Sequence, residues 1–322
     1  MFLLSRVSHN PVSGGELMIK TVKLAALIVI ALSGNTFIAS GARASVFPTQ
    51  HPPGQTKATD PTAGVLYYGG PVISNAQIYL ILWGAKVSTT TTAAMPDFYA
   101  SMVNSNYMDF LKIYNTTGLT AQDGTHTGTN QSIGHGTFLQ TIQIAPAKLS
   151  GTIDDLEIQA ELEGQIAAGK VPAQTANSLY MIHFPKGLKI TMHDGTTVAT
   201  SCQQFCAFHN GFQPKKGSAI YYGVIPDLDS LACSLGCGSG GSLARITTSA
   251  SHEMIEAITD PIPTPGSNPA FPQAWNTKDG QEIGDLCQSN TASLVGHNAT
   301  YQVQQEWDNS LGGCTTGDYQ AN

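Results

Sequence analysis

Short, continuous apolar runs recur along the chain and are rich in β-branched and aromatic residues. The run at residues 76–84, closed by Gly84, is too short for a buried helix and is typical of a strand covered on both faces. The alternating segment at 138–144 predicts another strand. The same patterns predict strands at residues 178–184, 219–225 and 300–307.

Between these runs, apolar residues recur every three or four positions, the spacing of a helix packed against a core. This spacing predicts one or two helices at 94–114, another at 153–168 and a third at 248–258. Thr247 or Thr248 is expected to cap the third helix, and Pro261 to end it at Asp260. Its predicted core face is Ala250, Met254, Ala257 and Ile258. The order of elements indicates an α/β domain with a twisted mixed sheet.

The first 44 residues have the pattern of a secretory signal peptide. Lys20 and Lys23 precede an apolar run at 24–32, and a small-residue cleavage site follows at 42–44. The run is too short and interrupted for a stable membrane span, although a single anchor is the alternative. We therefore expect a secreted, extracellular or periplasmic protein. Beyond a Pro/Thr-rich linker at 45–64, residues 65–322 are expected to form a single domain, with 261–322 as a small C-terminal lobe tied by a disulfide.

The charge of the chain argues against a nucleic-acid partner. The formal net charge is -7, whereas a nucleic-acid binder normally carries a basic patch. Only 11% of the residues are charged, below the roughly 25% that is usual. Such a weakly charged, hydroxyl-rich composition is typical of secreted proteins.

All six cysteines lie in the second half of the chain, and an exported protein with an even number of cysteines is expected to form disulfides. Proximity in sequence predicts the pairs Cys202–Cys206, Cys233–Cys237 and Cys287–Cys314. The alternative is a zinc site made from the two Cys-x3-Cys pairs.

The segment His252-Glu253-x-x-Glu256 is the main candidate for chemistry. On a helix, His252 and Glu256 lie one turn apart on one face and can bind the same metal ion. Glu253 can then act as a general base on a water molecule. The motif resembles the His-Glu-x-x-His of zincin metalloproteases, with Glu256 in place of the second histidine. It therefore predicts a zincin-like domain in which this is the active-site helix.

A catalytic zinc ion usually has three protein ligands, so the motif needs a further donor. Glu282 or Asp285, close to Cys287, is expected to supply it, and Asp260 is a competing candidate. Asp260 can alternatively hold the helix end or hydrogen-bond to His252. We expect one divalent ion, with zinc favoured, although two carboxylate ligands make oxygen-preferring metals more competitive. The alternative is a solvated helix whose His and Glu hydrogen-bond to neighbours.

His209 follows Cys206 closely and has three interpretations: a catalytic proton donor to an oxyanion, an additional metal ligand, or a structural histidine. His183 lies in a predicted strand and is expected to line the core. The remaining histidines of the predicted domain occupy polar loops and are expected to be solvated; they are His126, His135, His193 and His297.

Several motifs, taken in order, resemble the plant phosphate-induced (Exordium-like) secreted proteins. They are Tyr67-Tyr68-Gly69-Gly70-Pro71-Val72, the strand at 78–84, Cys202-x3-Cys206-x2-His209, Cys233/Cys237, Ser251-His252-Glu253-x-x-Glu256-Ala257, Ala274-Trp275 and Glu282-Ile283-Gly284-Asp285-Leu286-Cys287. The similarity extends from about residue 65 to Cys314; Asp260-Pro261 stands where plant members have Asn-Pro. The resemblance implies a secreted or cell-wall protein linked to growth responses, without an established reaction.

Three functions follow as hypotheses. The first is a secreted zincin-like metalloprotein that hydrolyses peptides, with His252, Glu256 and Glu282 or Asp285 as ligands. The second is a non-catalytic Exordium-like protein that binds a cell-surface or wall polymer. The third is a metal-independent glycoside hydrolase that uses the carboxylates of Glu253, Glu256, Glu282 and Asp285.

Overall fold

The computed structural model describes residues 64–194, 197–263 and 269–322. The predicted signal peptide at 1–44, and all of the predicted linker except residue 64, lie outside these ranges. The described residues all belong to one compact unit. No helix within them combines the length and the apolar character needed to cross a lipid bilayer.

A mixed five-stranded sheet forms the centre of the fold, in the order β3-β2-β5-β9-β8. The strands are β3 (Thr137–Ile144), β2 (Gln77–Trp83), β5 (Ser178–His183), β9 (Ile220–Ile225) and β8 (Phe208–Phe212). The first four are parallel, and β8 runs antiparallel to β9. The predicted strands at 76–84, 138–144, 178–184 and 219–225 are confirmed, and so is the mixed α/β class. Strand β8 has no apolar run or alternation that predicts it from sequence.

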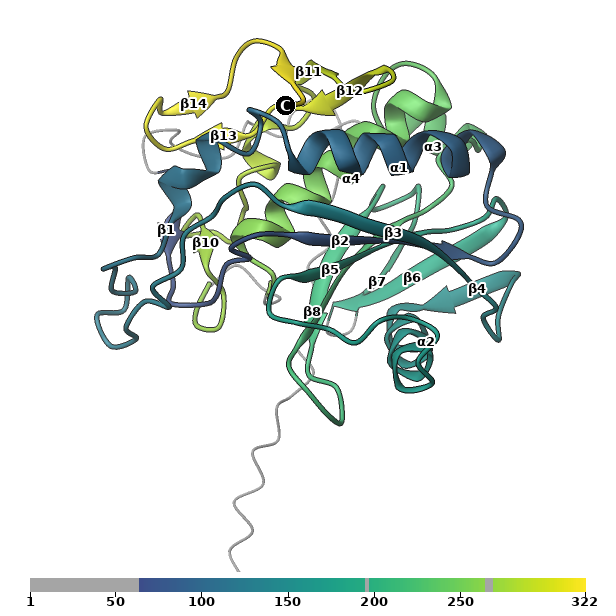
Figure 1. Cartoon of the computed structure of the whole chain (residues 1–322), viewed down its shortest axis with the longest axis horizontal. Coiled ribbons are helices and arrows are strands. Elements are labelled where there is room, and N and C mark those ends of the chain that lie inside the picture. The colour runs from purple at the N-terminus through teal and green to yellow at the C-terminus, as the bar shows by residue number, and fades with distance from the viewer. Residues whose placement is uncertain (1–63, 195–196, 264–268) are drawn as a thin grey trace, which may run out of the picture. The chain divides into compact units, whose positions relative to one another are not determined.

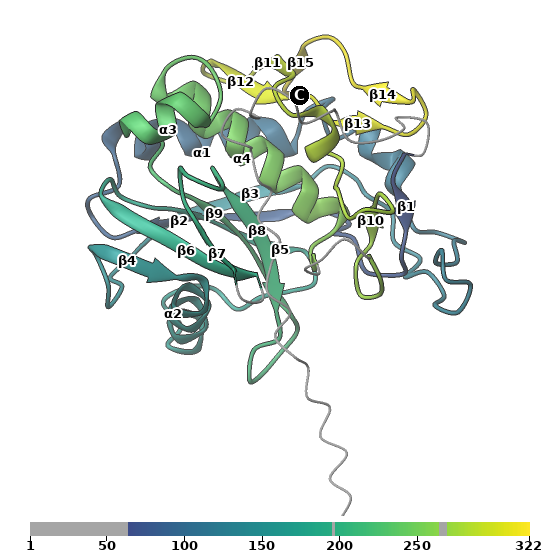
Figure 2. The ribbon, with the colours of Figure 1, turned by 180° about the vertical axis from the view of Figure 1, so that it is seen from behind.

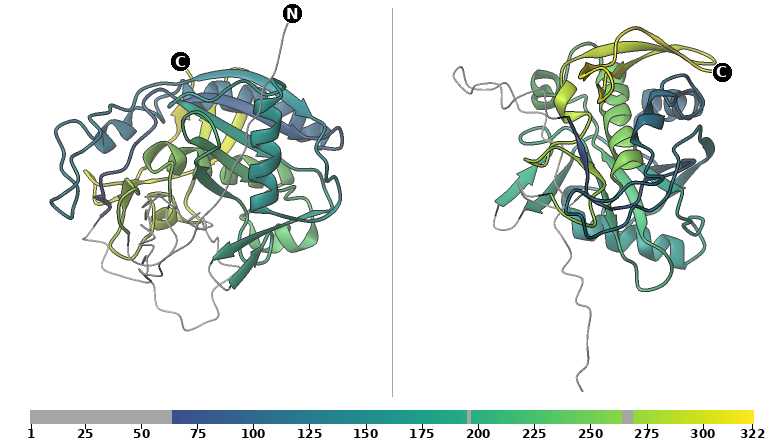
Figure 3. Two further views of the ribbon diagram at one scale, coloured as in Figure 1. Left: turned by 90° about the horizontal axis from the view of Figure 1, so that it is seen from below. Right: turned by 90° about the vertical axis from the view of Figure 1, so that its left-hand side faces the viewer.

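Helices cover both faces of this sheet (Figures 1 and 2). The helices α1 (Thr89–Val103) and α4 (Ser242–Thr259) lie on one face, and α2 (Asp155–Ala167) lies on the other, as the left view of Figure 3 also shows. Alternate residues of β2 serve the two faces: Ile78 and Leu80 pack into the core of α1 and α4, whereas Tyr79 and Ile81 pack into the core of α2. This two-sided burial explains why β2 is almost continuously apolar.

Shorter elements surround the central sheet. The strands β4 (Gly151–Asp154), β6 (Leu188–Asp194) and β7 (Thr197–Thr200) form a small sheet beside α2. The strands β1 (Leu66–Tyr67) and β10 (Trp275–Asn276) pair with each other. The predicted helical region at 94–114 consists of the C-terminal part of α1 and the short helix η1 (Phe110–Tyr114).

The C-terminal strands lie on the side of α1 and α4 away from the central sheet (Figures 1 and 2). They are β11 (Thr291–Val295), β12 (Thr300–Gln304), β13 (Trp307–Asp308), β14 (Gly313–Cys314) and β15 (Tyr319–Gln320), preceded by the short helix η2 (Asp285–Cys287). Leu294, Tyr301 and Val303 join the core formed by α1 and α4. The predicted C-terminal lobe therefore shares a hydrophobic core with the rest of the domain.

Helix α4 begins earlier than predicted. It starts at Ser242 with Gly241 at the N-cap, and Thr247 donates its hydroxyl to the carbonyl of Gln302 at 2.7 Å instead of capping a helix. The four predicted core residues, Ala250, Met254, Ala257 and Ile258, are confirmed in the hydrophobic core, and every other residue from Arg245 to Thr259 is buried as well. Serine is a weaker helix former than alanine by less than about 1 kcal/mol per residue. Packing of α4 against the sheet and β12 outweighs this cost.

The three disulfides are Cys202–Cys233, Cys206–Cys237 and Cys287–Cys314. The pairing by sequence proximity is therefore confirmed only for Cys287–Cys314. Cys233 and Cys237 lie one turn apart at α3 (Leu231–Gly236) and its C-cap, so both sulfurs face the turn that contains Cys202 and Cys206. The alternative zinc site is contradicted, because all four thiols are used in disulfides.

Candidate metal centre

The middle of α4 presents three ionisable side chains that are completely buried: His252, Glu253 and Glu256 each have 0% exposure. His252 Nε2 lies 3.0 Å from Glu256 Oε2, as the one-turn spacing requires. The predicted convergence of this imidazole and this carboxylate is thus present in the structure. This burial contradicts the solvation assumed in the alternative interpretation, although His252 and Glu256 do hydrogen-bond to neighbours.

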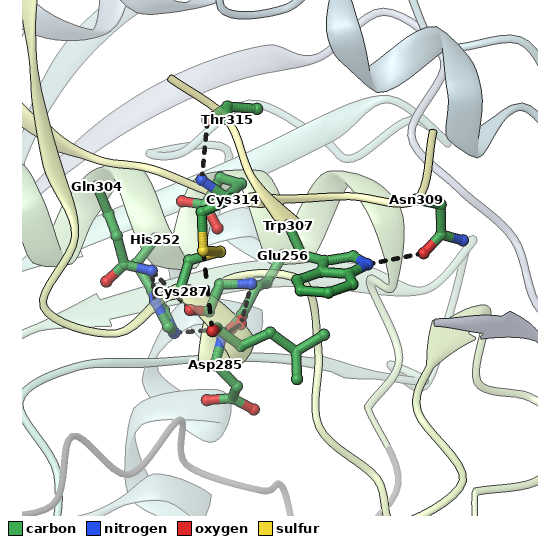
Figure 4. Close-up of a disulfide and its surroundings, with 12 residues drawn as sticks. His252, Glu256, Asp285, Cys287, Gln304, Trp307, Asn309, Cys314 and Thr315 are labelled. Carbon is green, nitrogen blue, oxygen red and sulfur yellow. Dashed lines mark hydrogen bonds and ion pairs between the residues drawn. A yellow bond between two sulfur atoms is a disulfide. The ribbon is translucent and has the colours of Figure 1, made fainter. Parts of the chain in front are cut away.

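The segment before η2 fixes the orientation of Glu256 (Figure 4). The backbone amides of Gly284 and Asp285 donate to Glu256 Oε1 at 3.1 and 3.0 Å, which leaves Oε2 directed at His252. A Cβ atom at Gly284 would lie 2.6 Å from His252 Nδ1 and 2.7 Å from Glu256 Oε1. Only glycine therefore allows the backbone to approach the pair this closely.

Gln304 of β12 holds the other side of the His252 ring. Its Nε2 lies 2.8 Å from His252 Nδ1 and donates to the carbonyl of Gly284 at 2.8 Å. Because Nε2 must donate to the Gly284 carbonyl, its second hydrogen is directed at His252 Nδ1, which acts as the acceptor. The proton of a neutral His252 ring then lies on Nε2, which faces Glu256 Oε2, and a metal ion bound at Nε2 would replace this proton.

His209 enters the same cluster from β8. It is opposite Gly223 of β9 in the strand pairing, and both residues face α4. His209 Nδ1 lies 3.2 Å from Glu253 Oε2 and 3.8 Å from Glu256 Oε2. Its Nε2 lies 3.4 Å from Glu282 Oε1 and 3.0 Å from the Asp260 carbonyl. His209 is therefore a full member of the cluster, whichever of its predicted roles it has.

Two predicted donors have other partners. The carboxylate of Asp260 accepts hydrogen bonds from the backbone amide of Ala274 at 3.0 Å and from the side-chain amide of Asn276, so it ties β10 to the end of α4. The carboxylate of Asp285 accepts from the backbone amide of Glu282 at 3.1 Å. Through these hydrogen bonds, both residues hold the loop that surrounds the cluster in place.

The described residues contain two three-residue groups with metal-binding spacing. One consists of His252, Glu253 and Glu256, and the other of His209, Glu256 and Glu282; in each, the donor atoms lie within 4.8 Å of one another. The predicted set of His252, Glu256 and Glu282 is thus divided between two groups that share Glu256.

Glu306 is a buried member of the cluster that the sequence analysis missed. It is 0% exposed, and Tyr107 donates its hydroxyl to Glu306 Oε1 at 2.9 Å. Burial raises the pKa of this carboxyl well above its ordinary range, although His252 opposes the shift. The signal that could have revealed it is an acidic residue within the predicted strand at 300–307.

Burial and neighbouring charges shift the pKa values of the acids in and around this cluster. Burial raises the pKa of Glu253, raises that of Glu282 well above its ordinary range, and raises the pKa values of Asp260 and Asp285 to about 7.

The pKa values of the two imidazoles are raised as well, but by neighbouring charges against the effect of burial. Burial alone would lower their pKa values, but nearby carboxylates outweigh it, so the pKa values of His209 and His252 are raised well above the ordinary value. Glu282 and Glu253 cause this shift at His209, and Glu256 and Glu253 cause it at His252. The site therefore attracts cations, whether protons or metal ions.

Three carboxylate oxygens reinforce this conclusion. Glu253 Oε1, Glu282 Oε1 and Glu306 Oε2 are buried and accept no hydrogen bond from the described residues. A buried carboxylate oxygen without a partner is costly, and a bound cation would remove that cost. The chemistry of the donors, imidazole and carboxylate, suits zinc and other divalent ions.

The chain matches no protein-family model, no curated protein sequence and no solved structure. Any functional conclusion therefore depends on the chemistry of the cluster itself.

Proposed function

We propose that this protein is a secreted, zincin-like metalloprotein that hydrolyses peptides with a divalent metal ion, zinc being favoured. One observation supports the proposal above all others: His252 Nε2 and Glu256 Oε2 are 3.0 Å apart in a buried group that also contains Glu253. This is the arrangement of two ligands and a base that the His-Glu-x-x-Glu segment predicts.

His252 and Glu256 would hold the ion, whose role is to polarise a carbonyl and acidify water. Glu253 is the general base in this proposal. His209 holds its Oε2 at 3.2 Å, and its Oε1 accepts no hydrogen bond within the described chain, so Oε1 can take a proton from water. Because a carboxylate replaces the second histidine, the ion would acidify water less than in a site with two histidines, and slow turnover is expected.

The deciding experiment is elemental analysis of the exported, oxidised protein beside three variants. We expect His252→Ala to lose most of its metal. Glu253→Gln should keep the metal but lose peptide cleavage by at least about 100-fold, as expected for a general base. The matched control is His183→Gln, which alters a buried histidine of β5 that bonds Tyr99 and belongs to neither metal-binding group.

Each result has a definite meaning. Equal metal content in the wild type and His252→Ala would overturn the proposed site. Loss of metal from Glu253→Gln would make Glu253 a ligand and would overturn its role as base. Cleavage that survives chelation would overturn metal-dependent hydrolysis.

The burial of the cluster favours a second candidate, a non-catalytic Exordium-like protein that binds a cell-surface or wall polymer. His252, Glu253 and Glu256 are 0% exposed, and Gly284 lies directly against two of them. Such a site suits a metal ion that stabilises the fold. A bound ion with no turnover on a broad peptide library would favour this candidate over the hydrolase.

A further inference from the structure

The Oε2 atom of Glu256 faces two imidazoles. It lies 3.0 Å from His252 Nε2 and 3.8 Å from His209 Nδ1, while two backbone amides hold Oε1. The imidazoles belong to separate metal-binding groups, one in each, and Glu256 is the member that the groups share. A single carboxylate oxygen is thus placed to contribute to two neighbouring cation positions.

The second group has the donors that a divalent ion needs. His209 comes from β8, Glu256 from α4 and Glu282 from the segment before η2, so three different parts of the fold converge. One nitrogen and two carboxylate oxygens suit zinc, manganese and related ions. All three residues are at most 4% exposed, so water competes little for their donor atoms.

An independent observation points to a cation beside His209. Oxygen atoms face both of its ring nitrogens: Glu253 Oε2 at Nδ1, and Glu282 Oε1 with the Asp260 carbonyl at Nε2. A neutral imidazole carries only one N–H, so its other nitrogen would turn a lone pair toward oxygen. A proton or a metal ion must therefore lie between that nitrogen and the oxygen that faces it. Glu282 Oε1, which accepts no hydrogen bond within the described chain, lies 3.4 Å from His209 Nε2, on the side of the Asp260 carbonyl.

The charge of the cluster also favours more than one cation. Five carboxyl groups are at most 4% exposed: Glu253, Glu256, Asp260, Glu282 and Glu306. One divalent ion offsets only part of this potential negative charge, and unpaired buried carboxylates are strongly disfavoured.

We propose that the centre binds two divalent ions, the first at the position of the proposed function and the second between His209, Glu256 and Glu282, with Glu256 shared. The proposal rests on the proposed function for its first ion. Two-metal centres of hydrolytic enzymes place their ions roughly 3.5–4 Å apart, a separation that one shared side chain can bridge.

Native mass spectrometry tests this inference, because it resolves proteins carrying none, one or two ions. The exported, oxidised protein is loaded with Zn²⁺, and separately with Mn²⁺, and freed of excess metal before measurement. We expect two ions in the wild type and one in Glu282→Gln, which keeps the shape of the side chain and alters only the second group. His209→Ala should also retain one ion, and the His183→Gln control should retain two.

The outcomes separate the two proposals. A maximum of one ion in the wild type with both metals would overturn the second position and leave the proposed function intact. Protein that binds no ion would overturn both. Two ions in Glu282→Gln and in His209→Ala would also refute the second position, since both variants remove its donors. Thermal unfolding and the intact mass of the disulfide-bonded chain verify that each variant is folded.

Discussion

The backbone amide of Gly284 donates a hydrogen bond to Glu256 Oε1 at 3.1 Å, across 28 positions of sequence. This bond fixes one oxygen of the carboxylate and directs the other toward His252 and His209. A loop that precedes η2 thereby sets the geometry of a side chain in the middle of α4. The integrity of the centre should depend on how closely this loop can approach the helix.

Replacing Gly284 with alanine should damage the centre. The new Cβ would lie 2.6 Å from His252 Nδ1 and 2.7 Å from Glu256 Oε1, so the loop or the side chains must move. Overpacking of this kind typically destabilises by about 1–3 kcal/mol. We expect a lower urea midpoint and weaker zinc retention. The control is Gly164→Ala in α2, where an added Cβ meets no atom within 4 Å; it should leave zinc retention unchanged.

Removal of the disulfide Cys287–Cys314 should loosen the loop that carries Glu282 and Asp285. The bridge spans 27 positions, and its loss from Cys287→Ala/Cys314→Ala should cost about 3 kcal/mol of unfolding free energy. The variant should also retain less metal, measurable by elemental analysis.

The matched control for that experiment is removal of Cys202–Cys233. Cys206–Cys237 joins the same two segments, so the remaining bridge keeps the chain closed there. This control should lose less stability and keep its metal. Equal metal content in the two double variants would contradict a role for Cys287–Cys314 in holding the centre.

Chelation should lower the thermal stability of the protein. An ion present at about 100 times its dissociation constant contributes about 2.7 kcal/mol, which corresponds to about 5 °C or more in Tm for a domain of this size. Calorimetry before and after EDTA, and again after zinc is restored, measures this difference. An unchanged Tm would argue against metal binding. The shift should be much smaller in His252→Ala, which lacks a ligand of the centre.

A buried acid outside the metal centre predicts a separate effect of pH on stability. Asp155, in the first turn of α2, accepts hydrogen bonds from Tyr222 at 2.5 Å, Gln159 at 3.0 Å and Asn210 at 3.2 Å. Burial nevertheless raises its pKa from 3.8 to about 6. The folded state therefore binds this proton more tightly than the unfolded state. The resulting stabilisation is complete below pH 3.8 and is lost as the pH rises to about 6.

Urea unfolding of wild type and Asp155→Asn at acidic and neutral pH tests this prediction. A shift of about two pKa units corresponds to about 3 kcal/mol. Between about pH 4 and pH 7, the wild type should therefore lose about 3 kcal/mol more than the variant. Asp318→Asn, which changes an exposed acid, should behave like the wild type. Parallel pH profiles for wild type and Asp155→Asn would show that Asp155 does not titrate in this interval.

The sequence by itself predicted those features of the structure that depend on residues close together in the chain. The apolar runs predicted three strands of the central sheet, because a strand buried on both faces needs apolar side chains in both directions. The alternating pattern predicted the edge strand β3. The spacing of His252 and Glu256 predicted their convergence, because residues one helical turn apart share a face.

Tertiary structure alone decided which other side chains complete the centre. His209 reaches it because the register of β8 against β9 sets it opposite Gly223, and Glu282 reaches it because the loop before η2 packs onto α4. The disulfide pairing likewise follows from how α3 faces the turn that holds Cys202 and Cys206. Strand register and loop packing are set by contacts between residues distant in sequence, and hydrophobic periodicity, which is local, carries no information about them.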